Sequence, residues 1–278
     1  MMMKHLLGFT AGAALAVLAA VPASAHRQWL LPSSTIVSGD DVWVTVDAAV
    51  SNDLFYFEHQ PLRLDAVKAW APDGSEARIE NAATGRYRST FDVHLTQRGT
   101  WRIASVSDGL VGSYELGGKT ERLPRGTTLA NLAMRLPAGA ANVKTAESSS
   151  RNEIFVTVGE PTTSLFTPSG KGIELAPVTH PNDLFAGETA IFQFLLDGKA
   201  AAGLPVTVIP GGIRYRDQLG QIDLVTDAEG KVEVTWPEAG LYWLNVTTPR
   251  TGGDAGEAEA AAPKRRASYA TTLEVMAP

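Results

Sequence analysis

The chain has 278 residues, with 24 lysine and arginine residues against 30 aspartate and glutamate residues, and it contains no cysteine. Its formal net charge of −6 argues against a nucleic-acid-binding protein, which would normally present a basic surface. The absence of cysteine excludes disulfide frameworks, thiolate zinc sites, iron–sulfur clusters and cysteine nucleophiles. A transition metal would therefore be held by histidine, carboxylate or backbone groups.

The first 25 residues have the three-part layout of a secretory signal peptide. A short polar start precedes an apolar run from Leu6 to Ala20, and the small-x-small cleavage sequence Ala-Ser-Ala ends at Ala25. The apolar run of about 15 residues is shorter than the roughly 20 residues that a membrane-spanning helix needs. We expect cleavage after Ala25, export to the periplasm, and a mature protein that is not embedded in a membrane. An uncleaved membrane anchor is the alternative.

Alternation of apolar and polar residues predicts β-strands along most of the mature chain, starting with the alternating valines between Val42 and Val46. Similar segments follow at residues 66–71, 85–95, 99–105, 153–158, 189–196, 205–209, 231–236, 240–247 and 270–275. Turn-forming pairs rich in glycine and aspartate separate them. Residues 128–135 indicate a short helix. The pattern predicts an all-β protein.

The mature chain is too long for one immunoglobulin-like sandwich, which has about 100 residues. We expect two immunoglobulin-like or fibronectin-like β-sandwich units in tandem. The first would span residues 26–158 and carry an irregular insertion from Val106 to Ser150. Residues 159–172, rich in proline, threonine, serine and glycine, would form a linker, and residues 173–278 the second sandwich.

The usual enzyme motifs do not occur in the sequence. It has no Gly-x-Ser-x-Gly elbow, no His-Glu-x-x-His pair, no phosphate-binding loop and no dinucleotide fingerprint. We therefore expect a protein that is not an enzyme and that has no catalytic residues.

Cleavage after Ala25 would make His26 the first residue of the mature chain. A terminal histidine offers its α-amine and its imidazole ring to one metal ion, and nitrogen ligands suit Cu(II), Ni(II) and Zn(II) better than Mg or Ca. This arrangement predicts a chelate at the N-terminus. The alternative is that His26 is simply the residue that follows the cleavage site.

Two further histidines of the first unit are candidate metal ligands. His94 lies in a predicted strand whose core face is formed by apolar neighbours, so its ring projects from the other face, where a histidine exposed to solvent is the alternative. His59 lies in an aromatic-rich loop, residues 55–61, that could instead close one end of the sandwich. We predict a metal site of His26 and His94, with His59 as an additional ligand. His180, in the second unit, is interpreted as a turn residue.

Four segments of the mature chain resemble a family of secreted bacterial proteins of unknown function. They are residues 26–32 (HRQWLLP), 94–103 (HLTQRGTWRI), 180–184 (HPNDL) and 211–217 (GGIRYRD). Members of that family are often labelled as periplasmic components of nickel or cobalt uptake. The resemblance therefore implies metal handling and a membrane partner, although this chain has no predicted transmembrane region of its own after cleavage.

The leading hypothesis is a periplasmic binding protein for a divalent transition metal, Ni, Co or Cu, that buffers the ion or delivers it to a membrane uptake component. A non-enzymatic module that binds a protein or glycan is the first alternative. A copper oxygenase that uses the N-terminal histidine is the second, and it would need an exposed flat aromatic surface.

Overall fold

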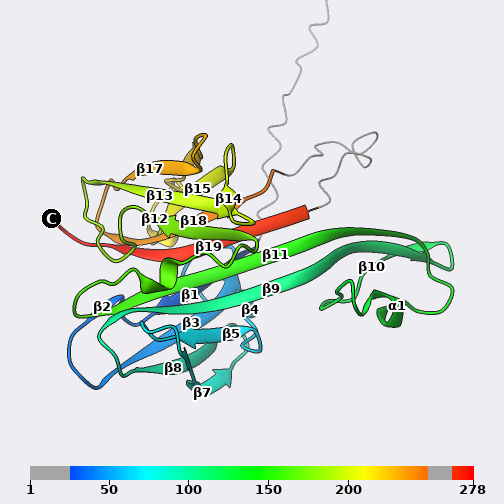
Figure 1. Ribbon diagram of the computed structural model, residues 1–278, viewed down its shortest axis with the longest axis horizontal. Coiled ribbons are helices and arrows are strands. Elements are labelled where there is room, and N and C mark those ends of the chain that lie inside the picture. The colour runs from blue at the N-terminus through cyan, green and yellow to red at the C-terminus, as the bar shows by residue number, and fades with distance from the viewer. Residues whose placement is uncertain (1–25, 250–264) are drawn as a thin grey trace, which may run out of the picture.

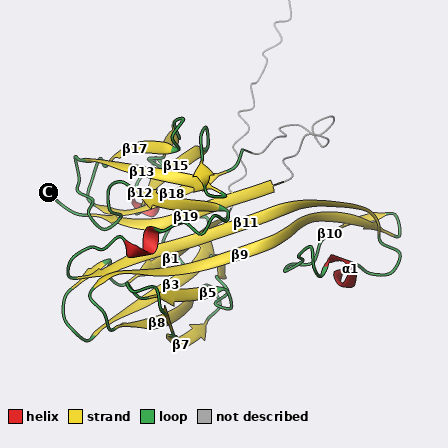
Figure 2. Ribbon diagram, viewed as in Figure 1, coloured by secondary structure: helices red, strands yellow, loops and turns green. Residues whose placement is uncertain are grey.

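A computed structural model describes residues 26–249 and 265–278 (Figure 1). The predicted signal peptide, residues 1–25, lies outside the described residues. Figure 2 shows a chain built from strands and loops, with helices confined to short segments. The described helices are α1 (Leu132–Arg135) and the 3-10 turns η1 (Ser164–Phe166) and η2 (Ile213–Tyr215). The protein is all-β, as the alternating pattern predicts.

Three sheets make up the described part of the molecule. The first sheet contains β1 (Arg27–Pro32), β3 (Val42–Ser51), β4 (Gln60–Pro61), β7 (Ile79–Thr84) and β8 (Ser89–Leu95). The third contains β12 (Ile173–Pro177), β13 (Thr189–Leu196), β14 (Lys199–Ala200) and β17 (Lys231–Thr235). The sheet between them, here called the central sheet, contains β2 (Ile36–Val37), β5 (Val67–Trp70), β6 (Glu76–Ala77), β9 (Gly99–Leu116), β10 (Lys119–Arg122), β11 (Ala141–Val158), β15 (Pro205–Pro210), β16 (Ile222–Val225), β18 (Gly240–Thr247) and β19 (Arg265–Val275).

The central sheet runs through both sandwiches, because β11 pairs in parallel with β19. In Figure 1 the first sheet lies on one side of this layer and the third sheet on the other. The side chains of β11 alternate accordingly: Ile154 and Val156 pack in the core of the first sandwich, and Phe155 packs in the core of the second. A strand that is buried on both faces has a nearly continuous apolar sequence, which explains the residues at positions 154–158. The tandem sandwiches therefore share one layer.

The segment from Val106 to Ser150 is more regular than the sequence predicts. Strands β9 and β11 are each 18 residues long and pair from Gly99↔Val158 out to Glu115↔Ala141. They form a long hairpin that extends beyond the sandwich in Figure 1. The outer half of this hairpin is mostly half-buried or exposed on both faces, so it carries no period-two signal. The prediction of an irregular insertion is therefore wrong at both ends of the segment.

A third apolar cluster lies where the two sandwiches meet. It joins Trp29 of β1 and Ala49 of β3 to Ile209, Trp243 and Ala270 of the second unit. The Trp29 side chain is fully buried, and its indole N–H donates to Ser51 Oγ at 2.8 Å. No strand is predicted for residues 27–32, since the burial of β1 between two units hides the alternation that a half-exposed strand would show.

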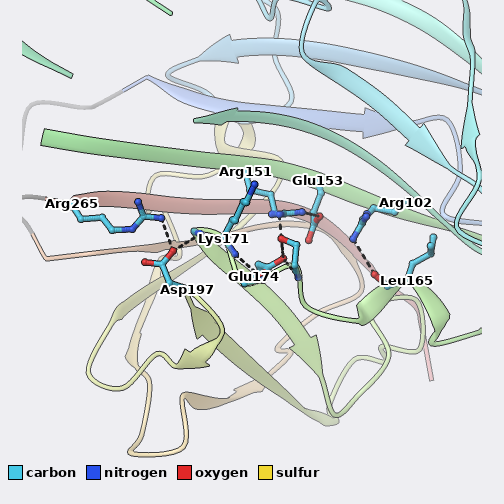
Figure 3. A network of polar contacts seen from close by, with 11 residues as sticks. Arg102, Arg151, Glu153, Leu165, Lys171, Glu174, Asp197 and Arg265 are labelled. Carbon is cyan, nitrogen blue, oxygen red and sulfur yellow. Dashed lines mark hydrogen bonds and ion pairs between the residues drawn. The ribbon is translucent and has the colours of Figure 1, made fainter. Parts of the chain in front are cut away.

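A buried polar network fastens the linker and β12 to the central sheet (Figure 3). Arg151 of β11 contacts Glu153 at 3.4 Å and Glu174 of β12 at 3.3 Å, and these side chains are at most 10% exposed. Glu174 also accepts the backbone N–H groups of Ser169 and Gly170 at 2.9 and 2.8 Å. Each carboxylate oxygen of Glu174 thus has a donor, as burial of a charge demands.

His180 forms a second bridge between the units. Its Nε2 lies 3.0 Å from Thr100 Oγ1 of β9 and 3.3 Å from the carbonyl oxygen of Thr162, and its Nδ1 accepts the N–H of Asn182 at 3.1 Å. Because Nδ1 accepts, the neutral ring carries its proton on Nε2. The Asn182 amide in turn donates to the carbonyl oxygens of Thr35 and Phe155. His180 is thus a connecting residue, beyond the simple turn residue that the sequence indicates.

Burial of His180 lowers its pKa below the ordinary value of 6.5, and hydrogen bonding to Thr162 opposes this only in part. The unfolded chain therefore binds the proton more readily, so this contribution to stability is present above about pH 6.5 and is lost as the pH falls below it. We expect the urea midpoint to fall less steeply between pH 7.5 and 5.5 in His180→Gln than in the wild type. Parallel slopes would contradict this role.

Candidate functional site

The structure brings His26 and His59 together. The antiparallel register places Arg27 of β1 opposite Ser51 at the end of β3, so His26 lies beside the loop that leaves β3. That loop carries His59, and the two imidazole rings stack with their centroids 3.8 Å apart and their planes 8° apart. Both residues are exposed. We call this pair the His26–His59 site.

The loop that carries His59, residues 52–59, is held by specific contacts. The Glu58 carboxylate accepts the backbone N–H groups of Asn52 and Asp53, both at 2.8 Å, and the Arg27 guanidinium donates to the Asn52 carbonyl oxygen at 2.6 Å. Phe55 lies in the left-handed region with φ of 64°, which is strained for an aromatic residue. Its ring packs edge-on against buried Trp29 at 5.6 Å. Trp29 belongs to the strand that follows His26, and Phe55 belongs to the loop that carries His59. The apolar cluster where the two sandwiches meet therefore positions both histidines.

The nitrogen atoms of the two stacked rings do not point toward a common metal position. Because the ring planes are only 8° from parallel and the centroids are 3.8 Å apart, the nitrogen lone pairs of the two rings lie in separate, nearly parallel planes. Binding of one ion by both rings requires that one ring rotate about its side-chain torsions, which is open to two exposed residues. Within residues 26–249 and 265–278, no three histidine, aspartate or glutamate side chains are grouped as metal ligands. A third protein ligand at the His26–His59 site would be the α-amine that cleavage after Ala25 frees.

His94 lies far from His26. It pairs with Trp43 at the start of β3, whereas Arg27 pairs with Ser51 at the other end, eight residues along the strand. At about 3.3 Å per residue this separates the two positions by roughly 26 Å. His94 contacts the Asp41 carboxylate and stacks on the Trp43 ring with centroids 4.3 Å apart. The predicted combination of His26 with His94 in one site is therefore not formed, because the two residues face opposite ends of the same strand.

Beside the His26–His59 site lies a cavity of about 620 Å³. His26 and Gln60 form part of its wall, and Arg125 and Arg135, from the segment between β10 and β11, form another part. Neither arginine stands out in the sequence, because both lie in the stretch that lacks any alternating pattern. Only the folding of this segment back toward β4 brings them near His26.

Sequence comparison assigns a family. A domain of unknown function, DUF4198, matches residues 23–250. The chain belongs to this family. The result agrees with the resemblance to secreted proteins of unknown function that the four segments indicate. No curated protein matches the sequence.

Two solved structures show distant similarity. One is a DUF4785 family protein from Legionella pneumophila, with 8% sequence identity and a TM-score of 0.22 over 78% of this chain; the chain spans half the length of that protein. The other is the D0–D1 domain of intimin, with 11% identity and a TM-score of 0.20, covering 88% of this chain and 97% of the domain. TM-scores this low do not establish a shared topology. In the described part of the chain, no helix is long and apolar enough to cross a membrane.

Proposed function

We propose that this protein is an exported, periplasmic binding protein for a divalent transition metal, Ni, Co or Cu, which it buffers or delivers to a membrane uptake partner. The observation that supports the proposal is the contact between His26 and His59. His26 is the residue that predicted signal cleavage would make N-terminal, and the fold places a second imidazole against it. The metal ligands proposed are the His26 α-amine, the His26 ring and the His59 ring.

The ligand chemistry favours ions that accept nitrogen donors in a plane. An α-amine and the imidazole of the same residue close a chelate ring, and a second imidazole adds a third nitrogen. Such N-rich tetragonal sites suit Cu(II) and Ni(II), whereas Mg and Ca prefer oxygen ligands. Both histidines are exposed, so an ion held here is accessible to a partner protein. Exposure of the ligands fits exchange of the ion better than permanent storage.

The test uses protein exported with its own signal peptide, with the N-terminus verified by intact-mass spectrometry. Elemental analysis should find Ni, Co or Cu, and calorimetric titration of metal-free protein should give a dissociation constant for each ion. We expect His26→Ala and His59→Ala each to weaken binding about tenfold or more, since even changes in the residues that orient metal ligands have effects of this size. Insertion of one alanine before His26 should do the same, because it moves the amine and keeps the ring.

His94→Ala is the matched control, because His94 lies at the opposite end of β3. It should leave the affinity unchanged. Equal loss in His94→Ala and His26→Ala, or unchanged affinity in the insertion variant, would contradict the His26–His59 site. Absence of any metal and of any binding would favour the non-enzymatic interaction module instead.

The copper oxygenase alternative needs a flat aromatic surface, and the described pair Tyr56 and Tyr215 does not provide one. The ring planes of half-buried Tyr56 and exposed Tyr215 are 63° apart, and the Arg214 guanidinium covers the Tyr56 ring at 4.7 Å. Oxygen consumption by the copper-loaded protein in the presence of a reductant and a polysaccharide would support this alternative.

A further inference from the structure

The cavity beside His26 has the size of a small-molecule site. Its volume of about 620 Å³ falls in the middle of the range of roughly 300–1,000 Å³ for ligand pockets. Strands from both layers of the first sandwich contribute to its wall, through Gln28 of β1, Gln60 of β4, Ser107 of β9 and Ser150 of β11. The opposite wall is the segment after β10. The lining is mostly polar, so the ligand that fits is polar too.

The charge of this cavity differs in sign from that of the whole protein. Three arginines, Arg63, Arg125 and Arg135, line it against one acidic residue, Asp65. Arg63 is neutralised by Asp65, with Nη2 2.7 Å from Oδ2. The guanidinium groups of Arg125 and Arg135 make no hydrogen bond or ion pair with any residue in the described part of the chain, whereas the backbone N–H of Arg135 donates to the Asn131 carbonyl oxygen at 3.0 Å. Two guanidinium groups without an acidic partner among residues 26–249 and 265–278 therefore face one cavity in a protein of net charge −6.

The segment that carries Arg125 is fixed against the long hairpin. Buried Thr127 accepts the N–H of Leu110 of β9 on its carbonyl oxygen at 2.7 Å, and buried Leu123 donates to the Gly112 carbonyl oxygen at 2.9 Å. A side chain at Gly109 would come within 2.7 Å of the Thr127 carbonyl oxygen, so the two backbones approach closely there. Arg125 thus lies between two anchored residues. The backbone of this part of the wall is therefore preorganised, which reduces the entropy cost of binding a ligand.

We propose that this cavity binds a small organic anion with two or more carboxylate groups. A guanidinium donates two parallel hydrogen bonds to a carboxylate, so Arg125 and Arg135 suit one carboxylate each. A single inorganic anion would leave most of the cavity unfilled, whereas a di- or tricarboxylate fills more of it and offers one carboxylate to each arginine. The serine and glutamine side chains supply further donors. The ligand class follows from two separate cationic groups in a polar cavity of this volume.

His26 lines the same cavity as the two arginines, so the anion site extends the proposed function of the His26–His59 site. A carboxylate held by the arginines would lie beside the metal ligands and could complete the coordination of the ion. The metal would then be bound as its carboxylate complex. This last step rests on the proposed metal-binding function, whereas binding of the anion itself does not.

The experiment titrates citrate into the metal-free wild-type protein by calorimetry, with succinate and inorganic phosphate as further probes. We expect citrate to bind, and to bind about tenfold or more weakly to the double variant Arg125→Gln/Arg135→Gln, because hydrogen bonds to charged groups have large effects on affinity. Arg86→Gln is the matched control: Arg86 is an exposed arginine outside the cavity, and its loss should leave citrate binding unchanged.

A second titration, of Cu(II) or Ni(II) with and without citrate, separates the two proposals. Tighter metal binding in the presence of citrate, lost in the arginine variant, supports the carboxylate complex. Metal binding with no citrate binding overturns this inference and leaves the proposed function standing. Citrate binding with no metal binding overturns the proposed function alone. Equal citrate affinity in the wild type and the double variant, or phosphate affinity equal to that of citrate, overturns the organic-anion site.

Discussion

Replacing Trp29 by alanine should lower the free energy of unfolding by about 3–5 kcal/mol, the usual cost of truncating a fully buried aromatic side chain. Trp29 is 0% exposed and packs between the two sandwiches, so its loss leaves a void that neither core can fill alone. It also leaves the Ser51 hydroxyl without its indole donor. Urea unfolding followed by circular dichroism measures the effect without relying on tryptophan fluorescence.

Trp43→Ala is the matched control for this prediction. The Trp43 side chain is 46% exposed and stacks only on the surface residue His94, so its removal should cost well under half as much. Because Trp29 contacts Phe55 of the loop that carries His59, Trp29→Ala should also weaken metal binding, whereas Trp43→Ala should not. Equal midpoints for the two variants would show that Trp29 does not join the sandwiches as described.

Replacing Glu174 by glutamine should lower the free energy of unfolding by about 3–5 kcal/mol, as is typical when one partner of a buried ion pair is removed. The side chains of Glu174 and Arg151 are 7% and 10% exposed, so the Arg151 charge would be left with Glu153 as its one carboxylate partner in Figure 3. Because Ser169 and Gly170 donate to different oxygens of Glu174, the NH2 group of the glutamine would also face one of these two N–H donors. Chemical denaturation at neutral pH measures the change.

The exposed ion pair of Lys68 and Glu76 provides the control. Its atoms are 2.8 Å apart, a shorter distance than in the buried pair, yet both side chains are more than half exposed. Glu76→Gln should therefore change stability by only about 0–1 kcal/mol. A loss in Glu174→Gln as small as that in Glu76→Gln would show that burial does not strengthen the Arg151 network.

The same carboxylate should contribute to acid stability. Burial alone would raise the pKa of Glu174, but hydrogen bonds from Ser169 and Gly170 and the charge of Arg151 outweigh it, so the pKa lies below the ordinary value of 4.5. Its contribution is therefore present above about pH 4.5 and is lost as the pH falls through the lowered pKa. Glu174→Gln should accordingly lose less stability than the wild type on acidification below pH 4.5.

Much of the strand order could be predicted from local patterns, and the exceptions share a cause. Residues 42–46 and 189–196 alternate because one face of each strand is buried and the other is open. Strand β1 and the outer parts of β9 and β11 lack this contrast, since β1 is enclosed by two units and the hairpin is largely open on both faces. Apolar and polar residues alternate with a period of two only when one face of a strand is more buried than the other. The alternation is therefore missing where both faces are equally buried or equally exposed.

The candidate ligands could be named from the sequence, but not their grouping. His26, His59 and His94 stand out because a chain without cysteine has no thiolate ligand to offer a transition metal, and histidine nitrogens are the main alternative. Their local sequences do not say which end of β3 each one approaches. The register of β1 with β3 places His26 next to His59, and the register of β3 with β8 places His94 at the other end.

The amino-acid sequence by itself determined that this is an all-β protein of tandem sandwiches without thiolate ligands, because composition and the alternation of neighbouring residues are local properties of the chain. Only the tertiary structure decided that β11 and β19 join the sandwiches into one sheet, that His26 meets His59, and that Arg125 and Arg135 face the same cavity. These are contacts between residues far apart in the chain. They depend on strand register and on the return path of the hairpin segment, which no local pattern encodes.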